Sequence, residues 1–109
     1  MKFNMCVVLV TAPSGIISKR LAEKILKSRT AACVNIISNI SSFYWWNNKI
    51  EKGRESLLVI KSRASLFSKL EKIIKTHHPY DVPEIIALPI MKGSTAYLNW
   101  ISHETSNKK

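Results

Sequence analysis

The sequence is short of the residues that build several common kinds of site. Its 109 residues include two cysteines, three glycines and seven acidic residues. Cys6 and Cys33 are too few, and too far apart in the chain, for a disulfide scaffold or a zinc site. Three scattered glycines leave no glycine-rich loop of the kind that cradles phosphate. We therefore expect neither a disulfide-stabilised protein nor a phosphate-binding loop.

Long apolar runs are also missing. The apolar run near the start, Met5–Val10, is much shorter than the roughly 20 residues that cross a bilayer. No small-residue cleavage site follows a hydrophobic segment of the length found in secretory signals. We expect no membrane partner and a cytoplasmic location.

Positive charge is abundant, with seventeen lysines and arginines and a net charge of +10. Eight of them fall on two predicted helices, in 19–29 and in 69–75, and such lysines usually form the solvated faces of amphipathic helices. A nucleic-acid interface is the alternative interpretation, but no recognition motif accompanies the charge. We expect no nucleic-acid partner.

Apolar patterning predicts four strands and three helices. The β-branched or extended stretches that are typical of strands are 5–10, 33–46, 49–62 and 84–90, and the apolar run in the last of these predicts a buried strand. Helical periodicity joins Ile17, Leu21 and Ile25, then Leu66–Ile74, and Ser14 is the expected N-cap of the first helix. A short terminal helix capped by Ser94 completes the set. The order β-α-β-β-α-β indicates one α+β domain over 1–109, a split βαβ arrangement with both helices on one face of an antiparallel sheet.

The second and third strands are too long for an isolated domain. Each has about fourteen residues, whereas strands usually have about five or six. Their far ends carry Phe43, Tyr44, Trp45 and Trp46, joined by the turn signal Asn47-Asn48. An uncovered two-stranded ribbon with exposed aromatic residues is marginally stable and prone to association. We therefore expect another copy of the chain to cover it.

The densest group of chemically active residues is 77–84, which reads His-His-Pro-Tyr-Asp-Val-Pro-Glu. Pro79 and Pro83 favour extended geometry at the residues before them, so this segment is expected to be a rigid connector. Imidazole nitrogens suit copper, zinc and nickel. The plain structural alternative is that His77 interacts with the dipole of the preceding helix while His78 forms hydrogen bonds within the connector.

Residues for catalysis are not apparent. The sequence offers no nucleophile beside a base and no carboxylate pair at catalytic spacing, so we expect that the protein is not an enzyme. Cys33 is expected to be a small core residue, and Cys6 is expected to be the more accessible of the two thiols.

Together these motifs resemble the divalent-cation-tolerance protein family, CutA. The motifs that carry the resemblance are Val10-Thr11-Ala12-Pro13, the stretch 31–37, Tyr44-x-Trp46, Lys49-Ile50-Glu51, Glu55 with Ile60-Lys61, His77-His78-Pro79-Tyr80, Val82-Pro83-Glu84 and Tyr97-Leu98-x-Trp100. The resemblance implies a ferredoxin-like subunit with a long hairpin and a short C-terminal helix. It also implies a homotrimer built through edge strands and a role in metal tolerance, most often discussed for copper.

The same resemblance suggests where the site residues lie. His77 and His78 are the expected metal ligands, for copper or another divalent cation. The residues expected to line an adjoining cleft are Lys61, Tyr80, Glu84, Glu51 and Glu55, and those expected at the subunit interface are Tyr44, Trp46 and Trp100. For Lys61 and the three glutamates, ion pairs between strands or subunits are the equal alternative.

One departure from the family pattern bears on the metal. Val10 stands where family members discussed as copper binders have a cysteine, and Cys6 is about 13 Å away along the same strand. Without the thiolate, Cu(II) is expected to bind better than Cu(I), because imidazole does not favour the soft ion. A Val10→Cys change should raise Cu(I) affinity if that side chain faces the histidines.

Two functions remain open from the sequence. The first is a cytoplasmic homotrimer that binds copper or divalent ions weakly through the histidine pair. The second is a trimeric signalling or scaffold module whose inter-subunit clefts bind a small anionic ligand or a partner protein, with metal binding incidental.

Overall fold

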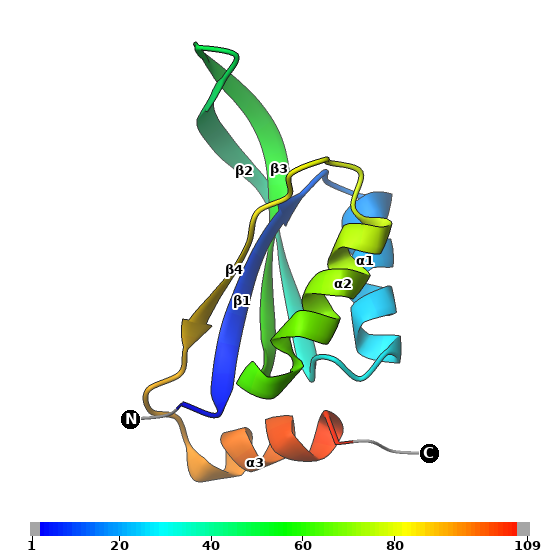
Figure 1. Cartoon of the computed structure of the whole chain (residues 1–109), viewed down its shortest axis with the longest axis vertical. Helices are drawn as coiled ribbons and strands as arrows, with labels where there is room; N and C mark the ends of the chain where they lie inside the picture. The colour runs from blue at the N-terminus through cyan, green and yellow to red at the C-terminus, as the bar shows by residue number, and fades with distance from the viewer. Residues whose placement is uncertain (1–2, 107–109) are drawn as a thin grey trace.

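Every second side chain along strand β1 (Met5–Ala12) is buried, so one of its two faces is covered. In the computed structural model, which describes residues 3–106, β1 lies between β3 (Lys49–Arg63) and β4 (Ile85–Pro89), and β2 (Cys33–Trp46) pairs with the outer side of β3 (Figure 1). All three pairings are antiparallel. The order β2-β3-β1-β4 confirms the expected split βαβ fold.

Two helices cover one face of this sheet (Figure 1). Helix α1 spans Ile16–Lys27, and α2 spans Phe67–His77 after the short 3-10 helix η1 (Ala64–Leu66). The core lies between helices and sheet, where fully buried aliphatic side chains meet: Val8, Val10, Leu58 and Ile60 from the strands, and Leu21, Ile25, Leu70 and Ile74 from the helices. Leu21, Ile25, Leu70 and Ile74 belong to the predicted helical stripes, so the periodicity identified the centre of each buried helix face.

The start of α1 differs from the prediction. Gly15, not Ser14, is the N-cap residue, and its φ of 80° is one that other residues adopt only with strain. The Ser14 hydroxyl instead accepts a hydrogen bond from Ser56. Ile17 is 40% exposed and Ser18 is buried, with its hydroxyl donating to the carbonyl oxygen of Pro13. The buried face of α1 thus begins with a small polar residue that the apolar pattern could not reveal.

Strand β4 was expected to be buried, and this was wrong. Ile85 alone is partly buried along it, while Ile86 and Leu88 are each 48% exposed. The reason is topological, since β4 is an edge strand and the helices cover only one side of the sheet. We call the uncovered side the open face, which carries Val7, Leu9, Ile37, Leu57, Val59, Ile86 and Leu88 by strand register.

Strands β2 and β3 continue far beyond their neighbours as a hairpin (Figure 1). Asn47 and Asn48 form its turn at φ 51° and 63°, as the sequence predicted. A bulge between Ile37 and Ile40, with Asn39 at φ 61°, inserts one extra residue into β2. Phe43 and Trp45 are 69% and 71% exposed, so the aromatic end of the hairpin is uncovered in the single chain.

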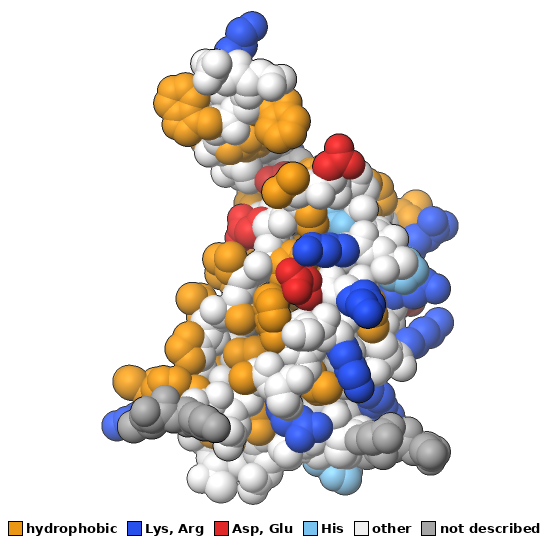
Figure 2. All heavy atoms as spheres, viewed as in Figure 1, with side chains coloured by type: hydrophobic (Ala, Val, Ile, Leu, Met, Phe, Trp, Pro, Cys, Tyr) orange, Lys and Arg blue, Asp and Glu red, His pale blue; other side chains and the backbone are white. Residues whose placement is uncertain are grey.

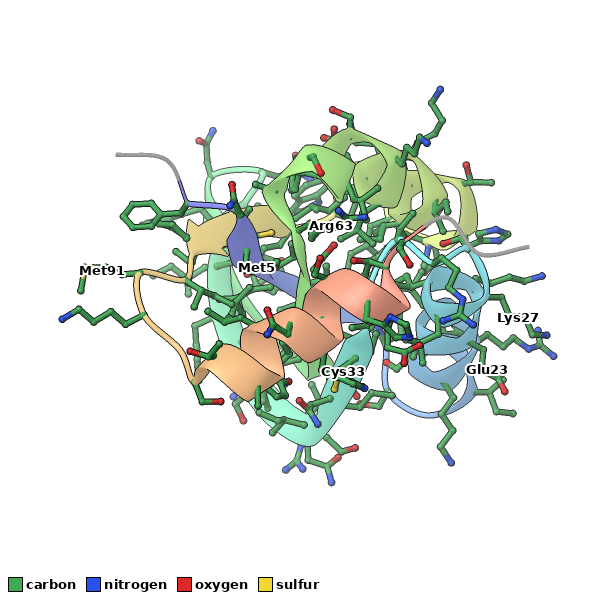
Figure 3. All side chains as sticks on the ribbon, turned by 90° about the horizontal axis from the view of Figure 1, so that it is seen from below. Met5, Glu23, Lys27, Cys33, Arg63 and Met91 are labelled. Atoms are coloured by element: carbon green, nitrogen blue, oxygen red, sulfur yellow. The ribbon has the colours of Figure 1, made fainter. Side chains whose placement is uncertain are left out.

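Surface charge and apolar surface lie on different sides of the molecule. In Figure 2 lysine and arginine gather over the helices, whereas apolar side chains follow the opposite edge of the sheet and the hairpin. Glu23 and Lys27 on α1 project away from the sheet (Figure 3). This arrangement confirms that the basic residues of α1 form a solvated helix face.

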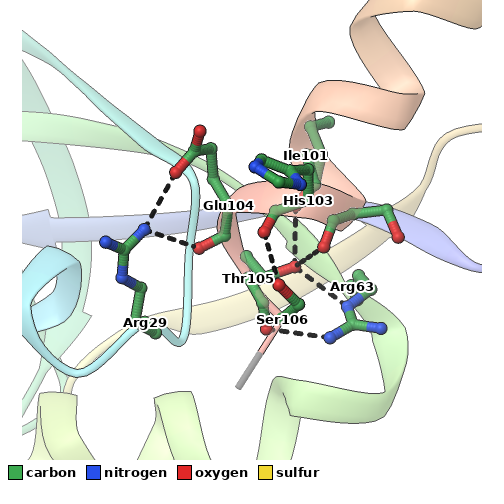
Figure 4. Close-up of polar contacts among 8 residues, drawn as sticks. Arg29, Arg63, Ile101, His103, Glu104, Thr105 and Ser106 are labelled. Atoms are coloured by element: carbon green, nitrogen blue, oxygen red, sulfur yellow. Dashed lines mark hydrogen bonds and ion pairs between the residues drawn. The ribbon is translucent and has the colours of Figure 1, made fainter. Parts of the chain in front are cut away.

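Helix α3 (Thr95–Glu104) crosses the lower end of the sheet (Figure 3). The Ser94 hydroxyl caps it by accepting a hydrogen bond from the Tyr97 N–H, as predicted. Two arginines hold its other end (Figure 4). Arg63 donates to the Thr105 hydroxyl at 2.9 Å and to the Thr105 carbonyl at 2.8 Å, and Arg29 pairs with Glu104 at 2.9 Å.

We predict that Arg63→Ala destabilises the protein by about 1–3 kcal/mol, because the Thr105 hydroxyl and the Thr105 carbonyl would both lose their hydrogen bonds from the charged guanidinium group. Arg29→Ala removes a pair in which the arginine side chain is 47% exposed, so its cost should stay below about 1 kcal/mol. Urea unfolding of the two variants beside the parent measures both values. An equal loss of unfolding free energy in the two variants would contradict the prediction that Arg63 stabilises the protein more than Arg29 does.

Candidate functional site

A cleft of about 710 Å³ lies where the hairpin leaves the body of the protein. One wall is formed by the aromatic residues 43–46 and by Glu55 of β3. The other wall is the connector between α2 and β4, which contributes Tyr80, Asp81 and Glu84. This volume is in the range of pockets that enclose small organic molecules. The cleft is the candidate functional site.

His78 fixes the start of the connector. It follows α2 with extended backbone angles, φ −88° and ψ 136°, as expected for a residue before proline. Its Nε2 lies 2.8 Å from the Thr11 carbonyl oxygen, and its Nδ1 accepts a hydrogen bond from the Tyr80 N–H at 3.1 Å. Because Nδ1 is the acceptor, the hydrogen-bond network assigns the proton to Nε2. His78 is only 7% exposed, so this imidazole ties the connector to the end of β1.

Tyr80 joins the connector to the hairpin. Its hydroxyl donates to Glu55 Oε2 at 3.0 Å, and its ring packs against His78 with centroids 4.7 Å apart. Desolvation raises the pKa of Tyr80 to about 12, and the hydrogen bond and negative charge of Glu55 add to this. Glu55 itself is 9% exposed, an unusually buried position for a carboxylate. The pair holds the two walls of the cleft together.

The two histidines have different environments. His77 is exposed in the last turn of α2, whereas His78 is buried and uses both ring nitrogens in hydrogen bonds. A metal ion on His78 would have to displace one of these bonds. Among residues 3–106 there is no group of three or more His, Cys, Asp or Glu side chains placed to hold a metal ion. The predicted histidine pair is therefore not joined by a third His, Cys, Asp or Glu ligand in the described part of the chain.

Within the single chain, Lys61 lies apart from the cleft. This residue lies six positions along β3 from Glu55, roughly 20 Å at the usual strand rise. Its ammonium group donates to the Asn35 side chain and lies 4.0 Å from the Cys33 sulfur. Lys61 is therefore at the opposite end of the open face from the cleft.

The remaining predicted residues divide between the two ends of the molecule. Glu55, Tyr80 and Glu84 line the cleft as expected, while Glu51 pairs with Tyr44 across the hairpin. Trp46 and Tyr44 lie on the hairpin, 58% and 47% exposed. Trp100 lies far from them on α3, with its ring 5.5 Å from that of Tyr97.

Val10 and Cys6 differ from what the sequence suggested. Val10 is fully buried in the core on the helix side of β1, so a cysteine there would face the core rather than the cleft. Cys6 is 3% exposed, and burial raises the pKa of its thiol. Its expected accessibility was wrong because alternate residues of β1 point under the helices.

Two features of the site were missed. Thr11 contributes both a wall of the cleft and the carbonyl that holds His78, and its place directly after the buried run could have suggested this. Asp81 lines the cleft beside Tyr80. It stands in the very segment singled out from the sequence, but no pattern distinguished it from the other polar residues there.

A small α+β domain with a long hairpin and a cleft at the hairpin's foot defines a recognisable structural class. The sequence model of the CutA1 divalent ion tolerance protein family matches residues 6–104. The chain therefore belongs to the CutA family, which confirms the resemblance read from its motifs.

Relatives and solved structures agree with this assignment. The chain is 48% identical over 99 residues to "Protein CutA 1, chloroplastic" of Oryza sativa, covering 91% of this chain and 56% of that protein. It is 41% identical over 99 residues to the "Divalent-cation tolerance protein CutA" of Thermus thermophilus, covering 91% of this chain and 96% of that one. The chain thus spans about half the length of the plant and animal relatives that it matches and nearly all of the Thermus one.

Among solved structures, CutA1 from Oryza sativa superposes with a TM-score of 0.93 at 45% identity, covering 97% of each chain. The divalent cation tolerance protein of Archaeoglobus fulgidus, named as periplasmic, gives 0.91 at 36% identity, over 94% of this chain and 99% of that one. Within residues 3–106, none of the helices has the length and apolar character needed to cross a membrane.

We predict that Tyr80 ionises later than an ordinary tyrosine. Because its folded-state pKa of about 12 exceeds the ordinary value of 10, the native state holds this proton more tightly. The resulting stability is fully present below pH about 10 and is lost as the pH rises towards 12. Ultraviolet titration of tyrosinate in the parent and in Tyr80→Phe identifies the group, and Glu55→Gln should shift its ionisation to lower pH. A Tyr80→Phe variant that keeps the late ionisation would contradict the assignment.

Proposed function

We propose that this chain acts in divalent-cation tolerance as a homotrimer, without enzymatic activity, and that its principal site is a ligand-binding cleft. The observation that carries the proposal is the cleft itself, with a partly buried Tyr80–Glu55 hydrogen bond across it. Its volume and aromatic walls suit an organic ligand better than a bare ion. This favours the ligand-binding alternative from the sequence over the histidine pair as the main site.

Self-association is supported by the apolar surface that a single chain leaves in water. Ile37, Ile86 and Leu88 on the open face are each about half exposed, and Trp46 and Ile50 of the hairpin are 58% and 65% exposed. Large contiguous apolar surfaces of this kind usually mark interaction sites. Both sheet edges, β2 and β4, also offer unpaired backbone groups. A second and third copy would cover the hairpin and these edges.

We predict a stable trimer at micromolar concentration by sedimentation velocity. Trp46→Ala should weaken assembly more than Trp45→Ala, because consecutive strand residues face opposite sides and Trp46 shares its side with Tyr44. The two variants remove the same side chain from neighbouring positions, so they control for each other. A folded monomer in the parent protein would refute the trimer, and equal weakening would refute the different roles of the two tryptophans.

Direct metal binding is a second candidate function. His77 is the exposed member of the histidine pair, so a divalent ion such as Cu(II) would bind weakly there, completed by water. No thiolate is placed beside it, since Val10 is in the core, and Cu(I) should bind less well than Cu(II).

We also propose a cytoplasmic location for the protein. Cell fractionation would test it, because relatives carry the names chloroplastic and periplasmic.

We predict that His77→Ala removes most Cu(II) binding, whereas His78→Ala mainly destabilises the fold, by about 1–3 kcal/mol, because the Thr11 carbonyl and the Tyr80 N–H both lose their partner. Calorimetric titration with Cu(II) and urea unfolding separate the two effects. His103→Ala serves as the control, because it removes an imidazole from α3 rather than from the connector. Loss of Cu(II) binding in His78→Ala with unchanged stability would instead support the pair as the site.

A further inference from the structure

We propose that a small pocket at the lower end of the molecule, opposite the hairpin, binds a phosphate group through Arg63. The inference goes beyond the function proposed above and does not depend on the cleft at the hairpin. It is drawn from the place, the charge, the free hydrogen-bond donors and the size of this pocket, which we call the Arg63 pocket.

The Arg63 pocket lies between the start of β1, the end of β3, η1 and α3. Its lining residues are Asn4, Met5, Arg63, Ala64, Ser65 and Ser102. In Figure 3 Met5 and Arg63 lie between α3 and the start of α2, and in Figure 1 this end of the molecule is the one away from the hairpin. Among the described residues, neither the hairpin nor an edge strand contributes to the lining. The pocket is therefore not part of the surfaces that the proposed trimer covers.

The pocket combines a positive charge with a lining that carries no negative one. Arg63 supplies the guanidinium group, and within residues 3–106 no aspartate or glutamate lines the pocket. Arg63 is partly buried, so its charge acts through surroundings that screen less than bulk water does. The positive end of the α2 dipole, directly after η1, adds to the attraction for an anion. An anion is thus the favoured occupant.

Hydrogen-bond donors are available in the same place. Arg63 commits its Nε donor to the Thr105 hydroxyl and an Nη donor to the Thr105 carbonyl, which fixes the plane of the guanidinium group and leaves its other N–H groups free to bind a ligand. The hydroxyl groups of Ser65 and Ser102 line the pocket, and neither has a hydrogen-bond partner among the described residues. A fixed arginine with hydroxyl groups beside it suits the several acceptor oxygens of phosphate.

The size of the pocket selects a small group. Its volume of about 210 Å³ is several times the roughly 30 Å³ that a water molecule takes in the liquid. It is smaller than the roughly 300–1,000 Å³ of pockets that enclose drug-sized ligands. A phosphate group fits this space, either as the free ion or as the end of a small phosphate monoester. Because side chains supply the donors, the site does not require the glycine-rich loop that the sequence lacks.

The test titrates the full chain with inorganic phosphate and with glycerol 3-phosphate, at an ionic strength kept constant with sodium chloride. Two-dimensional NMR follows the Arg63 Nε–H and the Ser65 backbone N–H, with the Asn48 N–H at the hairpin turn as a distant reference. Phosphate should shift the Arg63 and Ser65 signals to saturation and leave Asn48 unchanged. Saturation by both compounds would support a phosphate monoester as the ligand, and saturation by inorganic phosphate alone would support the free ion.

A matched pair of serine variants isolates the binding, since Arg63→Ala would also loosen α3. Ser65→Asp places a carboxylate in the pocket, where it competes with phosphate for Arg63, so phosphate affinity should fall about tenfold or more. Ser68→Asp adds the same charge at an exposed position in the first turn of α2, outside the lining, and solvent and salt should keep its effect below about threefold. Circular dichroism confirms that both variants fold as the parent does.

The outcomes that overturn the inference are distinct from those that bear on the cleft. Equal weakening of phosphate binding by the two aspartate variants overturns it, because the effect would then be one of net charge. Chloride that shifts Arg63 and Ser65 as phosphate does overturns it as well, because the pocket would then not select an oxyanion. Absence of a saturable shift at both residues in the parent protein shows that the pocket binds no phosphate, and it leaves the function proposed for the cleft unaffected.

Discussion

The pairing of β2 with β3 is the constraint on which the rest of the structure depends. These strands have 14 and 15 residues, whereas β1 has 8 and β4 has 5. Register continues from Cys33–Lys61 to Trp46–Lys49, interrupted by one bulge, so the two strands satisfy each other's backbone beyond the reach of any other element. The surplus length lifts the aromatic residues away from the core. It also creates the corner in which the cleft lies.

Tyr80 is the link between this projecting ribbon and the compact body. The connector that carries it is anchored at one end by His78 on the Thr11 carbonyl, and the tyrosine hydroxyl reaches Glu55 on the ribbon. Three strands are thereby joined: β1 through Thr11, β3 through Glu55, and β4, which begins directly after the connector. Chemically active residues are concentrated here because positioning the ribbon requires polar contacts that the aliphatic core cannot supply.

The sequence predicted the elements well because apolar spacing records which side of an element is covered. It predicted Leu21, Ile25, Leu70 and Ile74 in the core and Asn47-Asn48 at the turn, and all are confirmed. It failed for β4, whose apolar run matches a buried strand although half of that surface is open in the single chain. Apolar composition shows what a surface can bury, but not whether the partner belongs to the same chain.

The site was predicted less completely, for a different physical reason. Glu55, Tyr80 and Glu84 all line the cleft of the single chain, but Lys61 was grouped with them although it lies roughly 20 Å farther along β3. His77 and His78 are adjacent in sequence, yet one is exposed and the other has both nitrogens occupied. That a residue belongs to a motif does not specify where its side chain points. The choice of the Thr11 carbonyl as partner for His78 is made by the packing of a helix end over a strand end.

The separation of charge from apolar surface has a consequence for how far association can proceed. Association through the open face and the hairpin would leave the lysine-rich helices on the outside, and three chains of +10 carry 3 × 10 = +30. Like-charged shells of this kind repel one another at ordinary ionic strength. Growth would therefore stop once the apolar side is covered, since any further copy would meet only a positively charged exterior. The basic helices would then act as a colloidal barrier that separates a closed assembly from an aggregate.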